Sequence, residues 1–206
     1  MSTHQSGLKT QPAFNVVVCA SGGGGNFQAI LDKRDELEIT ISKLIVDKAC
    51  GAVQRAVQSG IDVYQLQKSE TLAQQLLSAI PSDTDLIVLA GFMPIVPKAV
   101  CELWHKKIIN THPSLLPKYG GKGMYGVKVQ QAVMQANEKY AGCTIHYVDA
   151  GIDTGEVLLQ KAIEVDYRLT PWELGGLVFK EENKLLVKAI ELIQQKANKK
   201  SEMQCN

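Results

Sequence analysis

Short apolar runs alternate with helix-like segments through the first half of the chain, and this alternation constrains the fold more than any other feature. The expected strands cover residues 14–20, 39–46, 61–66, 85–90 and 107–111. The expected helices between them cover residues 26–34, 52–59, 71–80 and 97–103. Strands that are apolar on both faces and separated by helices are typical of a parallel sheet covered on both sides. The sequence therefore predicts an α/β fold built on a single doubly wound, Rossmann-like sheet.

The pattern changes after the fifth expected strand. Residues 126–137 favour a helix, 142–148 alternate like a strand, and 156–163 form another apolar run. The glycines between the last two segments predict that they pair as an antiparallel C-terminal hairpin added to the sheet. Residues 170–196 have the pattern of a long amphipathic helix, with Thr170 as its N-cap.

A single domain accounts for the whole pattern. The chain has 206 residues, of which 45% are hydrophobic and 21% charged, an ordinary balance for a globular protein. We expect a domain spanning residues 13–197, with disordered tails at 1–12 and 198–206. No apolar run approaches the roughly 18 residues of a membrane-spanning helix, and the N-terminal stretch lacks the apolar core of a secretory signal.

Charge and cysteine content narrow the functional classes. Lys and Arg number 22 against 21 Asp and Glu, so no basic surplus favours nucleic acid as a partner. The 5 cysteines are odd in number, widely spaced and never form C-x-x-C, which argues against a disulfide framework or a zinc site. These features predict reduced thiols, a cytoplasmic location and no bound metal. They leave the oligomeric state open between a monomer and a homodimer.

The stretch SGGGGN, residues 21–26, lies between the first expected strand and the first helix. Backbone N–H groups converge in such a loop and the helix dipole adds positive charge, so the loop favours an anion such as phosphate. It lacks the Lys of a Walker A loop, which argues against an ATPase. Gly22 and Gly24 fit part of the dinucleotide fingerprint, with Phe27 in place of its third glycine and Asp47 as a candidate ribose ligand. A nicotinamide-dependent oxidoreductase, a non-catalytic phosphate-binding module and a turn without a ligand stay as alternatives.

The stretch NTHP follows the fifth expected strand. Asn110 and His112 are two residues apart, so an extended backbone points both side chains to one side. Pro113 biases His112 towards an extended backbone and stiffens the loop. Since ligands of such sheets bind beyond the carboxyl ends of the strands, this amide and imidazole are candidate catalytic groups.

Two other loops are expected at the same edge of the sheet. The apolar loop AGFMPIV, residues 90–96, suits either a pocket wall for a flat organic group or ordinary core packing. In the loop DAGIDTG, Asp149 is expected to initiate a turn, whereas the pattern alone leaves the role of Asp153 open. His146 precedes this loop and is interpreted as an ordinary strand residue whose ring finds its partners locally.

NTHPSLLPKYGG, residues 110–121, followed by GCTIHYVDAGIDTG, residues 142–155, resembles the folate-dependent formyltransferases. The resemblance runs from about residue 16 to residue 193. Within that family, the glycine loop, the AGFM segment and the short single-domain length are similar to the members that formylate glycinamide ribonucleotide in purine biosynthesis. The resemblance implies that the amino group of this substrate attacks the formyl carbon of 10-formyltetrahydrofolate, with no metal.

The resemblance also implies roles for individual residues. The catalytic group of the family falls on Asn110, His112 and Asp153. Its phosphate and ribose ligands fall on Gly24, Gly25, Asn26 and Glu182. Its folate-binding positions fall on Met93, Pro94, Ile95, Val96, Asn110, Val148 and Asp149, and the nearest counterpart of an Arg that reaches the folate tail is Lys68.

The chain departs from the family at several positions. Gly25 stands where many members have Ser, and Pro94 stands where an Arg is common. The segment 120–130 is longer than in many members and lacks a histidine that is often found there. These departures concern the contacts to the substrates rather than the chemistry.

The residue types suit the implied reaction. Amine attack on a formamide builds an oxyanion, which Asn110 can stabilise as an uncharged donor at every pH. His112 can donate as an imidazolium or carry the proton from the attacking to the leaving nitrogen. A nearby carboxylate favours the protonated ring, which is the role expected for Asp153. Another folate-dependent formyltransferase or a deformylase is the alternative within the family.

Overall fold

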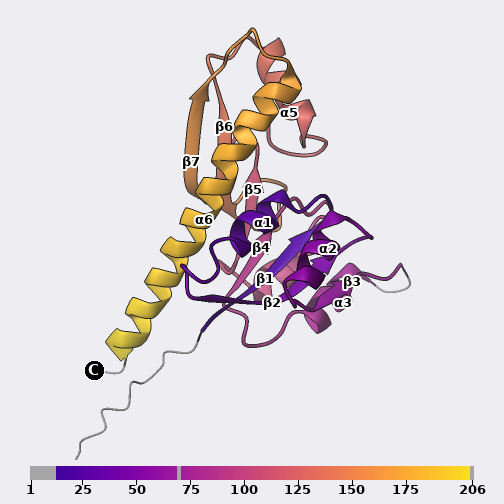
Figure 1. Ribbon diagram of the computed structural model, residues 1–206, viewed down its shortest axis with the longest axis vertical. Helices are drawn as coiled ribbons and strands as arrows, with labels where there is room; N and C mark the ends of the chain where they lie inside the picture. The colour runs from indigo at the N-terminus through magenta and orange to yellow at the C-terminus, as the bar shows by residue number, and fades with distance from the viewer. Residues whose placement is uncertain (1–12, 69–70, 205–206) are drawn as a thin grey trace, which may run out of the picture.

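The computed structural model describes residues 13–68 and 71–204, and its central feature is a seven-stranded sheet with helices on both faces (Figure 1). The strands are β1 (Phe14–Ala20), β2 (Ile39–Val46), β3 (Val63–Gln65), β4 (Leu86–Leu89), β5 (Ile108–His112), β6 (Tyr140–Tyr147) and β7 (Val157–Glu164). The helices are α1 (Gly25–Leu31), α2 (Gly51–Gln58), α3 (Leu72–Ala79), α4 (Lys98–Leu103), α5 (Val127–Gln135) and α6 (Pro171–Gln204). The predicted α/β class is confirmed.

The strand order is β3-β2-β1-β4-β5-β6-β7. The strands from β3 to β5 pair in parallel, as the alternation predicts. The chain order reverses between β1 and β4, which lie side by side at the centre of the sheet. In sheets of this kind the ligand site lies beyond the carboxyl ends of the strands at such a reversal.

The expected hairpin is confirmed, because β6 and β7 pair antiparallel. β6 also pairs antiparallel with β5, and this second pairing is the one that builds the site. Its register places Asn110 opposite His146, and His112 opposite Thr144. The two antiparallel strands therefore bring the second half of the chain against the end of the last parallel strand.

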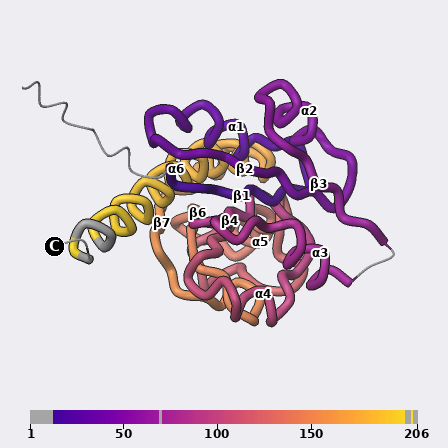
Figure 2. Tube along the Cα trace, turned by 90° about the horizontal axis from the view of Figure 1, so that it is seen from below, coloured from indigo at the N-terminus to yellow at the C-terminus, as the bar shows by residue number. Residues whose placement is uncertain are grey.

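Three apolar clusters hold the helices on the sheet. One face is covered by α1, α2 and α6, with Ile30, Ala52 and Leu186 fully buried (Figure 2). The other face is covered by α3 and α4, with Leu76 and Val100 buried between them and the strands. A smaller cluster packs α5 and α6 against β6. The apolar faces of α1 and α6 thus meet near the carboxyl end of β1.

Most of the predicted boundaries are shifted by a few residues, and the differences at β3 and at the end of α6 affect the fold most. The edge strand β3 covers only Val63–Gln65, against the expected 61–66, and its residues are no more than half-buried. Helix α6 continues through Gln204, so the disordered tail expected from residue 198 is wrong up to that point. The helix continues because Lys, Ala, Glu, Met and Gln are good helix formers, and neither Gly nor Pro interrupts them. The expected tail at 1–12 and the last two residues lie outside the described part of the chain.

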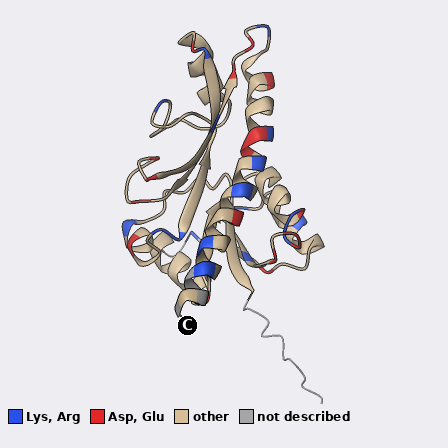
Figure 3. Ribbon diagram, turned by 90° about the vertical axis from the view of Figure 1, so that its left-hand side faces the viewer, with Lys and Arg blue, Asp and Glu red and all other residues tan. Residues whose placement is uncertain are grey.

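Acidic and basic side chains alternate along α6, and basic ones prevail towards its C-terminal end (Figure 3). Among the described residues, no helix combines the length and apolar character that crossing a membrane requires. Within residues 13–68 and 71–204, no group of three or more His, Cys, Asp or Glu side chains is arranged to hold a metal ion.

Candidate active site

A cavity of about 1110 Å³ lies beyond the carboxyl ends of the parallel strands. The four loops predicted to meet at this edge all contribute to its wall, together with residues 121–127 and the N-terminal half of α6. A pocket for one drug-sized ligand measures about 300–1,000 Å³. The cavity is therefore large enough to take more than one small molecule.

The carbonyl groups of the glycine loop point towards protein partners. The carbonyl oxygen of Gly22 accepts from the N–H of Ala52, and that of Gly23 accepts from Nε of Arg55. The carbonyl oxygen of Gly24 accepts from the N–H of Gln28. Because the first N–H groups of a helix have no acceptor within that helix, the loop offers donors rather than acceptors to a ligand.

The glycines of this loop differ in whether a side chain could replace their hydrogen. Gly24 has a φ of 74°, and an added Cβ atom would lie 2.8 Å from the Cα atom of Ala52. Gly23 has no such neighbour within 4 Å. Of the predicted phosphate and ribose ligands, Asn26 and Glu182 line the cavity, as does Gly22, whereas Gly24 and Gly25 are not among the lining residues.

Asn26 contacts α6 rather than capping its own helix. Its Nδ2 atom donates to Oε1 of Glu182 at 2.6 Å, and the N-cap of α1 is Gly24, without a side-chain cap. A buried carboxylate from a distant part of the chain accepts from its amide instead. Burial raises the pKa of Glu182, and the hydrogen bond from Asn26 opposes that rise. The hydrogen bond between Asn26 and Glu182 therefore holds the Glu182 carboxyl group at the cavity wall.

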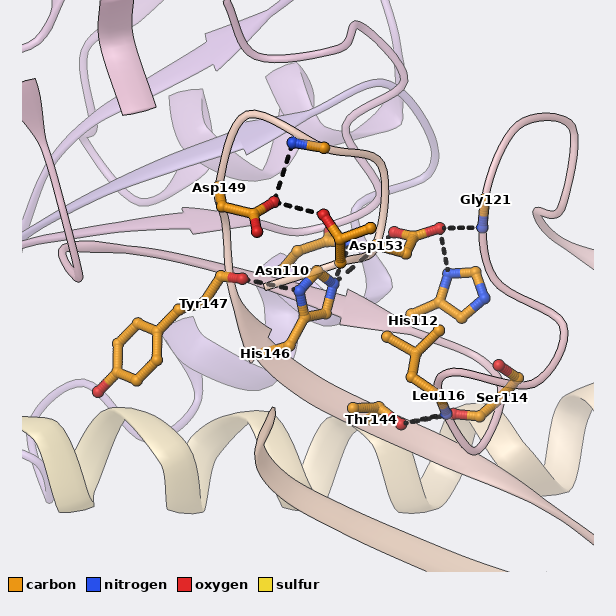
Figure 4. A network of polar contacts seen from close by, with 12 residues as sticks. Asn110, His112, Ser114, Leu116, Gly121, Thr144, His146, Tyr147, Asp149 and Asp153 are labelled. Carbon is orange, nitrogen blue, oxygen red and sulfur yellow. Dashed lines mark hydrogen bonds and ion pairs between the residues drawn. The ribbon is translucent and has the colours of Figure 1, made fainter. Parts of the chain in front are cut away.

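Asn110 and His146 form a hydrogen-bonded pair across β5 and β6 (Figure 4). The Nδ1 atom of His146 lies 2.9 Å from the carbonyl oxygen of Tyr147, which can only accept, so Nδ1 carries the hydrogen. The Nε2 atom of a neutral ring then accepts from Nδ2 of Asn110 at 3.1 Å. Burial lowers the pKa of His146, which favours this neutral form. His146 thereby fixes which way the Asn110 amide faces.

His112 is held between a carbonyl group and a carboxylate. Its Nε2 atom lies 2.9 Å from the carbonyl oxygen of Tyr119, and its Nδ1 atom lies 3.5 Å from Oδ2 of Asp153 (Figure 4). The ring is 4% exposed. The carbonyl accepts a hydrogen from Nε2, so a second proton on Nδ1 would place a cation directly beside the carboxylate.

Asp153 joins three parts of the site. Its Oδ2 atom accepts from the N–H of Gly121 at 2.9 Å, and its Oδ1 atom lies 3.7 Å from Nε2 of His146. Its backbone is in the left-handed region, with a φ of 58°, which turns the side chain into the cavity wall. The loop after β6 and the segment that follows His112 are therefore fastened to one another through this carboxylate.

The structure places the remaining predicted site residues as follows. Met93, Pro94, Ile95, Val96, Val148 and Asp149 all line the cavity, whereas Lys68 is exposed and is not among the lining residues. Asp149 initiates a turn, as expected, because its Oδ1 atom accepts from the N–H of Gly151 and the hydroxyl of Thr154. Lys48 and Lys122 are the lysines that line the cavity.

Sequence reasoning missed two residues of the site. His146 has the local partner that was expected, but it also orients Asn110, and only the pairing of β5 with β6 could have indicated this. Phe179 on α6 lines the cavity, and its place one turn before Glu182 was the available signal. Asp47, the candidate nicotinamide-ribose ligand, is not among the lining residues.

The carboxyl edge of this α/β sheet gathers an amide, an imidazole and a carboxylate around one large cavity, an arrangement typical of an enzyme active site. Residues 14–190 match the protein-family model described as formyl transferase. The chain belongs to the formyl transferase family.

Individual relatives agree with this assignment. The chain is similar to the chloroplastic phosphoribosylglycinamide formyltransferase of Vigna unguiculata, with 36% identity over 86% of this chain and 60% of that protein. It is 33% identical to the phosphoribosylglycinamide formyltransferase of Bacillus subtilis, over 81% of this chain and 88% of that protein. The phosphoribosylglycinamide formyltransferase structure from Anaplasma phagocytophilum superposes with a TM-score of 0.82 at 31% identity, covering 90% of this chain and 89% of that one. The chain thus spans less than two thirds of the plant relative.

Proposed function

We propose that this protein transfers the formyl group of 10-formyltetrahydrofolate to the amino group of N1-(5-phosphoribosyl)glycinamide, a step of purine biosynthesis. The names of the bacterial and plant relatives support the proposal. The observation that carries it is the convergence of Asn110, His112 and Asp153 on one cavity. We further propose that the reaction takes place in the cytoplasm, on the evidence of the unpaired, mostly buried cysteines.

Two parts of the cavity wall suit the two substrates. The segment Met93–Val96 and Val148 offer an apolar wall for the flat pterin ring of the folate. The glycine loop offers N–H donors for a phosphate, and Glu182 lies beside it as an acceptor for ribose hydroxyl groups. In the proposed reaction the glycinamide amine and the formyl carbon meet near Asn110, His112 and Asp153, and such positioning supplies much of the rate of a direct transfer.

The reaction proceeds through a tetrahedral intermediate. The amine nitrogen forms a bond to the formyl carbon, and the carbonyl electron pair moves to the oxygen. The remaining N–H of Asn110 donates to this oxyanion, and a protonated His112 stabilises it through its positive charge. The bond from carbon to N10 of the folate then breaks, and one amine proton passes to N10, so formylglycinamide ribonucleotide and tetrahydrofolate leave. Asp153 holds the His112 ring in place and stabilises its positive charge.

The proposal is tested by mixing the purified protein with 10-formyltetrahydrofolate and glycinamide ribonucleotide and following tetrahydrofolate release. Release that depends on both substrates supports the proposal. Release without the amine would indicate a deformylase, and release only with another amine acceptor would indicate a different formyltransferase. Protection by NAD against heat unfolding, with no formyl transfer, would favour the oxidoreductase alternative.

A further inference from the structure

Phe179 and Gly25 meet where α6 crosses the glycine loop. Phe179 lines the cavity and is 38% exposed. A Cβ atom added to Gly25 would overlap the Cζ atom of Phe179 and would lie 3.0 Å from its Cε1 atom. The aromatic ring therefore occupies the space that a side chain at position 25 would need.

The glycine at position 25 is required by this ring rather than by the backbone. Gly25 is not among the residues with positive φ, so other residues can adopt its backbone conformation. Gly23, in the same loop, has no atom within 4 Å of an added Cβ. The crowding is thus specific to the contact with Phe179.

The contact continues directly into the polar pair beside it. Gly25 and Asn26 are consecutive in the loop, and their partners Phe179 and Glu182 lie one turn apart on α6. An apolar contact and a buried hydrogen bond therefore fix the same stretch of loop against the same face of the helix.

We propose that Phe179 is a specificity-determining residue for the phosphoribosyl end of the amine substrate, and that it acts as a pair with Gly25. The proposal rests on the function proposed above. In its observed place the ring leaves no room for a side chain at position 25, so only backbone N–H groups are available to the phosphate there. The same ring gives the ribose subsite an apolar wall next to Glu182, which strengthens polar contacts by excluding water.

A double-mutant cycle tests the pairing. Gly25→Ser alone forces the ring out of its place and raises KM for glycinamide ribonucleotide by about fivefold or more. Adding Phe179→Ala removes the obstruction, so the double variant has a lower KM than Gly25→Ser alone. The KM for 10-formyltetrahydrofolate and the midpoint of thermal unfolding stay near the wild-type values in all variants. Leu177→Ala, at an exposed position on the same helix outside the cavity lining, is the control.

Binding of ribose 5-phosphate, measured by protection against heat unfolding, repeats the cycle without catalysis. Loss of binding in Gly25→Ser and its recovery in the double variant support the pairing even if the chain transfers no formyl group. The pairing would be overturned if the change in the double variant equals the product of the two single changes, both in KM and in protection by ribose 5-phosphate against heat unfolding. A KM for folate that rises in step with that for the amine would also overturn it, because the substitutions would then act on the whole structure.

Discussion

The proposed catalytic group and the glycine loop both border one cavity but are held in place in different ways. Asn110, His112, His146 and Asp153 are fixed by hydrogen bonds and ion pairs with defined partners. The glycine loop is fixed by backbone hydrogen bonds and also by steric fit, with Ala52 against Gly24 and Phe179 against Gly25. The first region should therefore be sensitive to the chemical identity of its side chains, and the second to their size.

The largest effect is expected for His112→Ala. In the proposed mechanism His112 stabilises the oxyanion by its charge and carries the proton, so kcat falls about 10²–10⁴-fold without it. The midpoint of thermal unfolding changes little by comparison, because the site borders a cavity. Steady-state turnover of His112→Ala is compared with that of His105→Ala, at an exposed position. Near wild-type turnover of His112→Ala would exclude the assigned role.

A smaller effect on turnover is expected for His146→Gln. The variant loses the ring that orients the Asn110 amide, and misplacing a catalytic group in this way costs about 10–10²-fold in kcat. KM for both substrates should change less than kcat. Equal losses in the two parameters would show that His146 contributes to binding instead.

The same variant has a pH signature in stability. Burial lowers the pKa of His146, so the unfolded chain takes up the proton first. The contribution of His146 to the free energy of unfolding is constant above its pKa in the unfolded chain, about 6.5. The free energy of unfolding falls as the pH drops below that pKa. Histidines titrate between about pH 5 and 8. Urea unfolding across this range should show that His146→Gln loses less free energy of unfolding towards acid pH than the wild type does. An acid loss equal to the wild-type loss would contradict the buried, neutral ring.

In the glycine loop, Gly24→Ala is expected to destabilise the fold by about 1–2 kcal/mol, because alanine resists the left-handed backbone. The added Cβ also meets the backbone of Ala52. Gly23→Ala is the matched control, since it has open space and no positive φ. Denaturant unfolding of the two variants measures the difference. Equal stabilities would show that the loop is not held by steric fit.

The smallest effect is expected for Glu182→Gln. Burial raises the pKa of Glu182 in the folded chain. Because the unfolded chain gives up the carboxyl proton at a lower pH, the free energy of unfolding falls as the pH rises through the folded-state pKa. The variant should therefore unfold a few degrees higher than wild type at pH 8, with the difference vanishing near pH 4. A lower unfolding temperature of the variant at pH 8 would show that the charged carboxylate stabilises the fold.

The two regions also differ in how far the sequence predicts them. The parallel strands were predicted well because strands such as β4 are apolar and buried over their whole length, and the NTHP motif placed Asn110 and His112 at a strand end. The partners of these residues were not predicted. His146 faces Asn110 because β5 and β6 pair antiparallel, although a long segment that includes α5 separates them in the chain. Asn26 donates to a carboxylate 156 residues away. Such contacts depend on tertiary packing, which leaves no local pattern.

Initial-velocity kinetics test the central claim, that the amine and the folate occupy the one cavity together and react directly. Tetrahydrofolate release is measured while the concentrations of glycinamide ribonucleotide and 10-formyltetrahydrofolate are varied in turn. Direct transfer predicts double-reciprocal lines that intersect, and no release when the amine is omitted. Parallel lines, or release of tetrahydrofolate with the folate substrate alone, would contradict the account.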